Sequence, residues 1–127
     1  TISLALTAAE TGHLVFGTLH TSGAPNTINR IIDVFPSEQQ AQIRAQIAES
    51  LKMVVTQKLF KKKDGSGRIG AFEVMTANAP VKNLIRENKI HQITSVMQTS
   101  QRDGMITMEK SIEGLVGSGE IENPSAE

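Results

Sequence analysis

The spacing of apolar residues predicts that the chain begins with a helix followed by an extended segment. Residues 1–10 carry apolar side chains on one helical face, and Gly12 is suited to end that helix. The next residues, HLVFGTLH at 13–20, form an unbroken apolar run rich in strand formers. This run is too short for a stable helix. It predicts a strand buried on both faces, as in a parallel sheet covered by helices.

The same spacing predicts two more helices before the middle of the chain. Residues 21–27 are turn-like and predict a loop, and residues 28–35 place isoleucines on one helical face before a proline ends the pattern. Residues 36–51 predict a longer helix that opens with a capping box of Ser37 and Gln40. Its apolar stripe consists of Ile43, Ile47 and Leu51.

A hairpin is predicted next. Two arms rich in strand formers, Val54–Lys61 and Arg68–Met75, flank KKDGSG, which is a turn signal. The lysines at 61–63 are most simply a solvated edge that discourages aggregation between strands. Contact with a phosphate or a membrane is the alternative interpretation of this charge run.

Beyond the hairpin the pattern again has the helical period. Asn78 is placed to cap a helix that takes Pro80 in its first turn, and a second helix runs through residues 90–97. A third helix is predicted to begin after Asp103, and residues 122–127 predict a disordered polar tail. The apolar residues of the third helix are Met105, Met108, Ile112, Leu115 and Val116.

Composition narrows the classes of function. The 127 residues include 13 basic and 13 acidic side chains, so no excess positive charge favours a nucleic-acid partner. Four Phe with no Trp or Tyr leave little aromatic surface for base stacking, and the absence of Cys excludes disulfides and cysteine-held metals. No apolar run approaches the roughly 20 residues that span a bilayer. Because the first residue is Thr1, we expect the chain to be a fragment.

Three kinds of chemical site are weak in this sequence. Gly12 and Gly17 have the spacing of a phosphate loop, but bulky residues lie between them and no Lys-Ser/Thr follows. Glu10 and His13 have a metal-ligand spacing, yet His20 would lie about 23 Å from His13 along an extended strand, so we expect no metal site. The serines lack the G-x-S-x-G pattern of an activated nucleophile.

His20 is the remaining candidate, because it ends the predicted buried strand. In open α/β sheets, ligands bind beyond the carboxyl ends of the strands. A histidine there either donates a hydrogen bond to an anion or caps loop carbonyl groups, and the residues alone favour capping.

Four segments of the chain carry a family resemblance: TAAETGHLVFGTLHTSGAPNTINRIIDVFP, VTQKLFKK, GRIGAFEVM and APVKNLIREN. Together they resemble the C-terminal half of the type IV pilus retraction ATPase family, which is part of the hexameric secretion ATPases, and the likeness runs from Thr1 to about Ile121. GHLVFGTLHT resembles the family's histidine box. PVKNLIRE resembles its AIRNLIRE motif, in which residues 83–87 match and residues 80–82 differ conservatively.

The resemblance implies a helix-rich α/β fold: the C-terminal part of a RecA-like P-loop ATPase core followed by a helical C-terminal region. It divides the chain into a partial core at 1–76, with the histidine-box strand, helices and hairpin, a helical region at 77–121 and a disordered tail at 122–127. The family's P-loop, acidic box and Walker B segment would lie upstream. We therefore expect ATP and Mg²⁺ to be bound only by the full-length protein, and this chain alone to be inactive.

The resemblance also assigns roles to individual residues. His20 would face the γ-phosphate or the attacking water as a γ-phosphate sensor, His13 would be the second histidine of the box, and Thr18 and Thr21 would accompany them. An imidazole that contacts ATP but not ADP would couple the nucleotide state to subunit position. The retraction motif would comprise Pro80, Val81, Lys82, Asn83, Leu84, Ile85, Arg86 and Glu87. Its polar face would lie on an exposed helix, for which an ordinary amphipathic surface is the simpler interpretation.

The implied function is that of a homo-hexameric, mechanochemical ATPase that drives type IV pilus retraction and twitching motility. Such a motor would be cytoplasmic, peripheral to the inner membrane and bound to the pilus platform protein there, with no nucleic-acid partner and no membrane span. Two alternatives remain: a pilus-assembly or type II secretion ATPase, and a non-enzymatic helical interaction module. The lack of a cysteine cluster near LFKKKDGSGR and the presence of NLIRE both argue against the first alternative.

Overall fold

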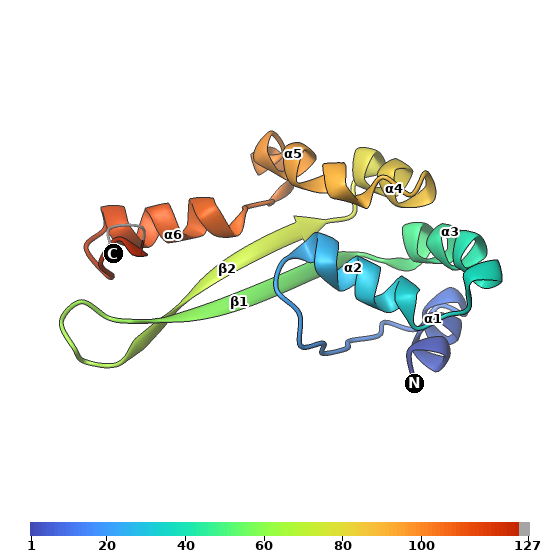
Figure 1. The fold of residues 1–127 in the computed structure, drawn as a ribbon, viewed down its shortest axis with the longest axis horizontal. Helices are drawn as coiled ribbons and strands as arrows, with labels where there is room; N and C mark the ends of the chain where they lie inside the picture. The colour runs from blue at the N-terminus through green and yellow to red at the C-terminus, as the bar shows by residue number, and fades with distance from the viewer. Residues whose placement is uncertain (125–127) are drawn as a thin grey trace.

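A long antiparallel hairpin forms the axis of the molecule (Figure 1). The computed structural model describes residues 1–124, and within them the sheet has two strands, β1 (Met53–Lys61) and β2 (Arg68–Thr76). The predicted hairpin is therefore confirmed to within one residue at each end. In the connecting turn, hydrogen bonds from Ser66 hold the pKa of the Asp64 carboxyl below its usual value. The larger contribution comes from the Ser66 side chain and the smaller one from its backbone amide.

Helices gather around the end of the hairpin opposite its turn, and α6 lies beside the strands nearer the turn (Figure 1). The helix predicted at 1–10 and the helices predicted beyond the hairpin are confirmed, and so is the helix-rich α/β class. The α-helices are α1 (Ile2–Glu10), α2 (Ala24–Asp33), α3 (Gln40–Ser50), α4 (Ala79–Arg86), α5 (Ile93–Gln98) and α6 (Met108–Gly117). Short 3₁₀ turns are η1 (Ser37–Gln39), η2 (Ile90–Gln92) and η3 (Gln101–Asp103).

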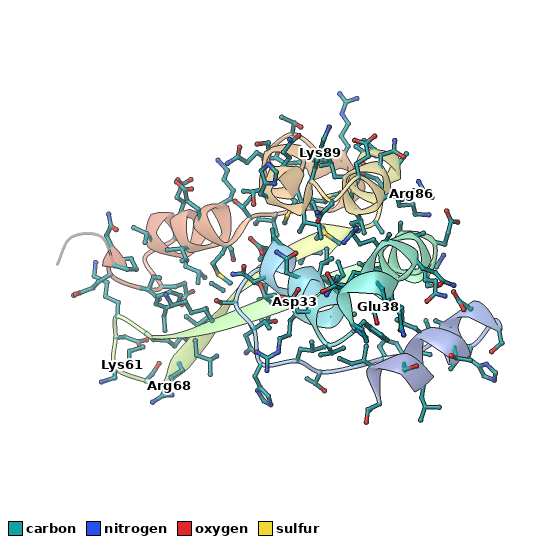
Figure 2. All side chains as sticks on the ribbon, turned by 45° about the vertical axis from the view of Figure 1, so that its right-hand side comes forward. Asp33, Glu38, Lys61, Arg68, Arg86 and Lys89 are labelled. Atoms are coloured by element: carbon teal, nitrogen blue, oxygen red, sulfur yellow. The ribbon has the colours of Figure 1, made fainter. Side chains whose placement is uncertain are left out.

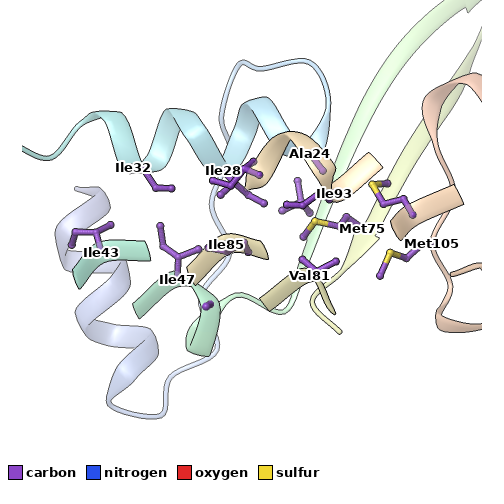
Figure 3. Packing of buried hydrophobic residues seen from close by; sticks show 14 residues of the cluster. Ala24, Ile28, Ile32, Ile43, Ile47, Met75, Val81, Ile85, Ile93 and Met105 are labelled. Atoms are coloured by element: carbon purple, nitrogen blue, oxygen red, sulfur yellow. The ribbon is translucent and has the colours of Figure 1, made fainter. Parts of the chain in front are cut away.

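The hydrophobic core lies where α2, α3, α4 and α5 meet the first residues of β1 and the last of β2 (Figure 3). Burying one isoleucine side chain of this kind contributes about 1.5–3 kcal/mol, so the cluster is the main source of stability. The predicted stripe of the long helix is confirmed at its two buried isoleucines, and Leu51 packs against the edge of the cluster. The largest fully buried side chains are Ile28, Ile47, Met75, Val81, Ile85, Ile93 and Met97.

The prediction of a loop at 21–27 is wrong in its second half. The helix already begins at Ala24 and ends at Asp33, two residues before the predicted end. Pro25 lies in its first turn, where the fixed φ of proline suits a helix and its missing N–H costs nothing. Gly23 precedes it with φ of +86°, a conformation that glycine adopts without strain.

The predicted capping box is also wrong. Ser37 lies in the 3₁₀ turn η1 and makes no capping hydrogen bond, and α3 begins only at Gln40. The Gln40 side chain instead donates a 3.0 Å hydrogen bond from Nε2 to the carbonyl oxygen of Phe35. The tighter 3₁₀ turn takes up the residues that the sequence pattern assigned to the first turn of the helix.

Caps explain where the C-terminal helices begin. Asn78 accepts a 3.1 Å hydrogen bond from the Val81 amide, which confirms the predicted cap of α4. The last helix begins at Met108 rather than directly after Asp103, because Thr107 caps it by accepting from the Lys110 amide at 3.2 Å. Of the predicted disordered tail, residues 125–127 lie outside the described residues.

The buried strand predicted at 13–20 is not present among residues 1–124. The segment is extended but pairs with no strand, and Leu14 and Phe16 are 77% and 88% exposed. A strand needs a partner for its backbone N–H and C=O groups, and the two strands of the hairpin pair with each other. The expectation of burial on both faces is therefore wrong for this structure.

The division of the chain at residue 76 stays a prediction. Side chains from before and after that point, such as Ile47 and Ile85, belong to the same buried cluster. Among residues 1–124, no helix combines the length and the apolar character needed to cross a bilayer.

Candidate functional site

The candidate site is the turn that joins the extended segment to α2 and carries His20. The His20 side chain is exposed, whereas Thr21 and Gly23 are half-buried. The hydroxyl oxygens of Thr21 and Thr27 lie 2.6 Å apart, and the Thr27 hydroxyl also donates to the Gly23 carbonyl oxygen at 2.9 Å. These bonds fix the turn against the first turn of α2, so the imidazole projects from an ordered support.

A buried carboxylate fixes the same turn from the other side. Glu73, on β2, accepts a 2.7 Å hydrogen bond from the Ala24 amide through Oε2. A Cβ at the neighbouring Gly23 would lie in ordinary van der Waals contact with the same oxygen, at 3.5 Å. Glu73 also accepts from the Met108 amide through Oε1, at 3.2 Å. The carboxylate therefore holds the beginnings of two helices.

Glu73 is a functional candidate that the sequence reasoning missed. Ala71, Glu73 and Met75 alternate along β2 and are all buried, so the carboxylate lies on the inner face of the hairpin. A charged residue between two apolar ones on the inner face of an amphipathic strand is the signal that would have found it.

His13 lies at the other end of the extended segment and is held by α1. Its Nδ1 atom lies 3.2 Å from the Ala8 carbonyl oxygen and 3.2 Å from the Thr11 hydroxyl. The first contact is a hydrogen bond in the tautomer that carries hydrogen on Nδ1. Thr18 is exposed within the extended segment. The structure thus places Thr21 against α2 but leaves His13 and His20 at opposite ends of residues 13–20.

The residues around His20 do not form a metal centre. No group of three or more His, Asp or Glu residues within 1–124 is placed to hold a metal ion. Two hollows of about 250 and 200 Å³ lie between α5 and α6 and between α1 and α3, and neither is lined by the turn at 20–23. His20 is therefore presented on an open surface.

The eight residues proposed as a retraction motif divide into a buried and an exposed half. Val81 and Ile85 are completely buried in the core, and Leu84 packs against it. The helix is thus amphipathic, with its apolar side against the core, and the role of its polar face in retraction stays a prediction. Pro80, Asn83, Arg86 and Glu87 are exposed, and Lys82 is half-buried.

The exposed half of this motif is linked to α3. Arg86 forms an ion pair with Glu49 and donates a 3.1 Å hydrogen bond from its other terminal nitrogen to Asn83 Oδ1. Glu87 pairs with Lys89 at 3.4 Å. Figure 2 shows Arg86 and Lys89 at the helical end of the molecule, far from Lys61 and Arg68 at the hairpin turn.

The chain is similar in sequence to a known protein family and to two named relatives. The family described as type II/IV secretion system protein matches residues 1–123. A twitching motility protein of Neisseria gonorrhoeae is 57% identical over 121 residues, which are 95% of this chain and 32% of that protein. The type IV pilus retractation ATPase PilT of Pseudomonas aeruginosa is 51% identical over 126 residues, which are 99% of this chain and 36% of that protein.

A solved structure shares the fold. The crystal structure of the pilus retraction motor PilT with bound ADP aligns with a TM-score of 0.85 and 41% identity, covering 99% of this chain and 37% of that one. The chain therefore spans about a third of the length of the relatives that it matches.

Proposed function

The chain belongs to the type II/IV secretion system protein family, and on that premise we propose that it is the C-terminal part of a pilus retraction motor. The full-length protein would be a homo-hexameric ATPase that converts ATP hydrolysis into type IV pilus disassembly. The observation that carries this proposal is the identity of 57% and 51% to proteins named for twitching motility and pilus retraction. Because the chain spans about a third of those proteins, the ATP-binding groups would lie in the rest of the full-length protein.

In this proposal His20 contacts the terminal phosphate or the attacking water. Its exposed ring projects from a turn that Thr21 and Glu73 hold in an ordered conformation, which orients the imidazole toward a ligand. Phosphoryl transfer depends mainly on positioning and on stabilising charge, and an imidazole supplies both without a covalent step. Loss of the γ-phosphate removes its partner, so ATP and ADP favour different positions of the turn. Thr18 would lie on the same face of the extended segment as His20, and His13 would be the second histidine of the box.

Mg²⁺ would accompany ATP but would be held by residues outside this chain. The Glu73 carboxylate, which contacts the residue after the turn, already accepts backbone amides through both oxygens. A hard divalent cation prefers free oxygen ligands, and this carboxylate is already engaged.

The exposed apolar side chains support the view that this chain is part of a larger core. Leu14 and Phe16 project from the extended segment, and the outer face of the hairpin also carries large apolar side chains. Single apolar residues at a protein surface are ordinary, whereas a group of large exposed apolar side chains marks an interaction surface. We propose that strands of the remaining RecA-like core pair with residues 13–20 and cover these side chains. The exposed apolar side chains on the hairpin are those of Met53, Val55, Leu59 and Phe72.

The α4 motif would form the mechanical output. Its buried half fixes α4 to the core, while Asn83, Arg86 and Glu87 remain exposed for contact with the rest of the hexamer or with a pilus platform protein. In this proposal the protein would act on the cytoplasmic side of the inner membrane.

The experiment that tests this function uses the full-length protein. We expect the purified protein to hydrolyse ATP as a hexamer, and its expression to restore twitching motility to a strain that lacks its retraction ATPase. Active hydrolysis with restored pilus assembly or secretion instead would identify another motor of the same family. A folded hexamer without ATP hydrolysis would support an interaction module and contradict the proposal.

A further inference from the structure

We propose that Glu73 is a positioning residue that couples the turn carrying His20 to α6 through a single carboxylate. The inference rests on the proposed function, because it assigns a mechanical role to a residue that does not itself meet the nucleotide. Glu73 is 7% exposed and lies on the inner face of β2. Within residues 1–124 no Lys or Arg forms an ion pair with it.

The two partners of the carboxylate are equivalent positions on two helices. Ala24 is the first residue of α2 and Met108 is the first residue of α6, and each donates its backbone amide to one oxygen of Glu73. The first amides of a helix have no acceptor within the helix, and the helix N-terminus carries partial positive charge. The two helix ends therefore compensate a buried charge that has no cationic partner. Each helix end depends on the same side chain.

The link to α6 is rigid because three consecutive residues of β2 hold α6 and the segment just before it. The Phe72 amide donates to the Ser111 hydroxyl at 3.0 Å, on one side of Glu73. On the other side, Val74 and Ile106 exchange backbone hydrogen bonds of 2.9 and 3.0 Å. Any displacement of Glu73 relative to α6 would therefore strain neighbouring hydrogen bonds as well as its own.

The link to His20 is short. Ala24 follows His20 by four residues, and the turn between them is fixed by the threonine pair and by Gly23 with φ of +86°. A movement of His20 toward or away from a γ-phosphate would pull on the Ala24 amide. Because one carboxylate cannot follow two helices that move apart, the position of the turn and the position of α6 are energetically linked.

A spare donor lies next to the carboxylate. Thr56 pairs directly with Glu73 across the hairpin, is also 7% exposed, and has a buried hydroxyl without a hydrogen-bond partner. Directly opposite residues in an antiparallel pair have Cβ atoms roughly 5 Å apart, within reach of a small side-chain rotation. The Thr56 hydroxyl thus offers Glu73 an alternative partner when one helix amide withdraws, which lets the link exist in two arrangements.

The test compares Glu73→Gln with Thr107→Ala in the full-length protein. The Gln side chain has the same shape but one oxygen, so its amide group must face one of the two backbone N–H donors. Thr107→Ala removes a cap from the same end of α6 but leaves the Ala24 contact intact. We expect Glu73→Gln to lower kcat by about tenfold while KM for ATP stays unchanged. Thr107→Ala should lower Tm as much as Glu73→Gln does but change kcat by less than about twofold.

A double-mutant cycle shows whether Glu73 acts through His20. We expect Glu73→Gln to lower kcat in the wild-type background and to have no further effect in a His20→Ala background. If the reductions in kcat from Glu73→Gln and His20→Ala multiply in the double variant, the proposal is overturned. Equal losses of kcat in Glu73→Gln and Thr107→Ala would also overturn it. If Glu73→Gln fails to fold, Gly23→Ala strains the same turn, because φ at this position is +86°, and is also expected to lower kcat.

Hydrogen exchange separates this inference from the proposed function, because it needs no ATP hydrolysis. We expect Glu73→Gln to speed exchange at the Ala24 and Met108 amides together, and Thr107→Ala to speed exchange only in α6. An unchanged rate at Ala24 in Glu73→Gln would refute the link even if the protein is an active ATPase. A protein without ATPase activity in which both amides respond would refute the proposed function and retain the link.

Discussion

Arg86 on α4 and Glu49 on α3 form an ion pair that joins the exposed half of the proposed retraction motif to the neighbouring helix. Both side chains are more than a third exposed, at 39% and 68%. Exposed pairs of this kind contribute roughly 0–1 kcal/mol, so the pair cannot be a main source of stability. Its effect is to hold the guanidinium group, which also donates to Asn83 Oδ1, in one orientation on the surface.

Arg86→Ala is therefore expected to impair twitching motility while leaving ATP hydrolysis largely intact. The free energy of unfolding should fall by about 1 kcal/mol or less, and ATP turnover of the full-length hexamer should remain within about twofold. Twitching motility should fall strongly if the exposed face of α4 transmits force. Glu49→Gln is the matched control for the ion pair, because it removes the pair but leaves the guanidinium exposed. Loss of ATPase activity in a folded Arg86→Ala hexamer would contradict a separate output role.

Ile85→Ala is expected to act on stability instead. Ile85 is completely buried in the core, so truncation should cost about 2–5 kcal/mol, measurable by chemical denaturation. Leu84→Ala, at the partly buried neighbouring position, should cost less and serves as the comparison. A cost below about 1 kcal/mol for Ile85→Ala would mean that α4 does not pack as described.

His20→Ala is expected to lower ATP turnover about a hundredfold in the full-length protein while nucleotide binding survives, because the ring is proposed to act on the terminal phosphate alone. The measurement pairs steady-state hydrolysis with equilibrium binding of a non-hydrolysable ATP analogue. His91→Ala is the control, since His91 is exposed on η2 and lies outside the proposed site. Unchanged turnover in His20→Ala would remove the sensor role.

Thr56→Val is expected to leave stability unchanged or raise it by up to about 1 kcal/mol. The Thr56 hydroxyl is buried without a partner, and valine replaces it with a methyl group of similar volume. Thr76→Val is the matched control on β2, because the Thr76 hydroxyl donates a 3.1 Å hydrogen bond to the Asp103 carbonyl oxygen and its loss should cost about 1 kcal/mol. Thermal unfolding of both variants provides the comparison, and a clear loss of Tm in Thr56→Val would show that its hydroxyl has a partner.

The sequence determined the elements whose signals are local. The hairpin arms around KKDGSG, the cap at Asn78 with Pro80 behind it, and the isoleucine spacing of α3 each lie within a few residues, and each was confirmed. Turn and helix signals act through backbone conformation and nearby hydrogen bonds, so they need no knowledge of distant partners. The likeness to the histidine box and to NLIRE is local in the same sense.

The tertiary structure decided everything that depends on partners far along the chain. Residues 13–20 have the composition of a buried strand, but burial requires neighbouring strands, and residues 1–124 pair theirs elsewhere. Glu73 accepts from amides 49 and 35 residues away, a relationship that exists only after α2 and α6 have packed on β2. Local pattern fixes which face of an element is apolar, whereas the identity of what covers that face is settled by packing alone.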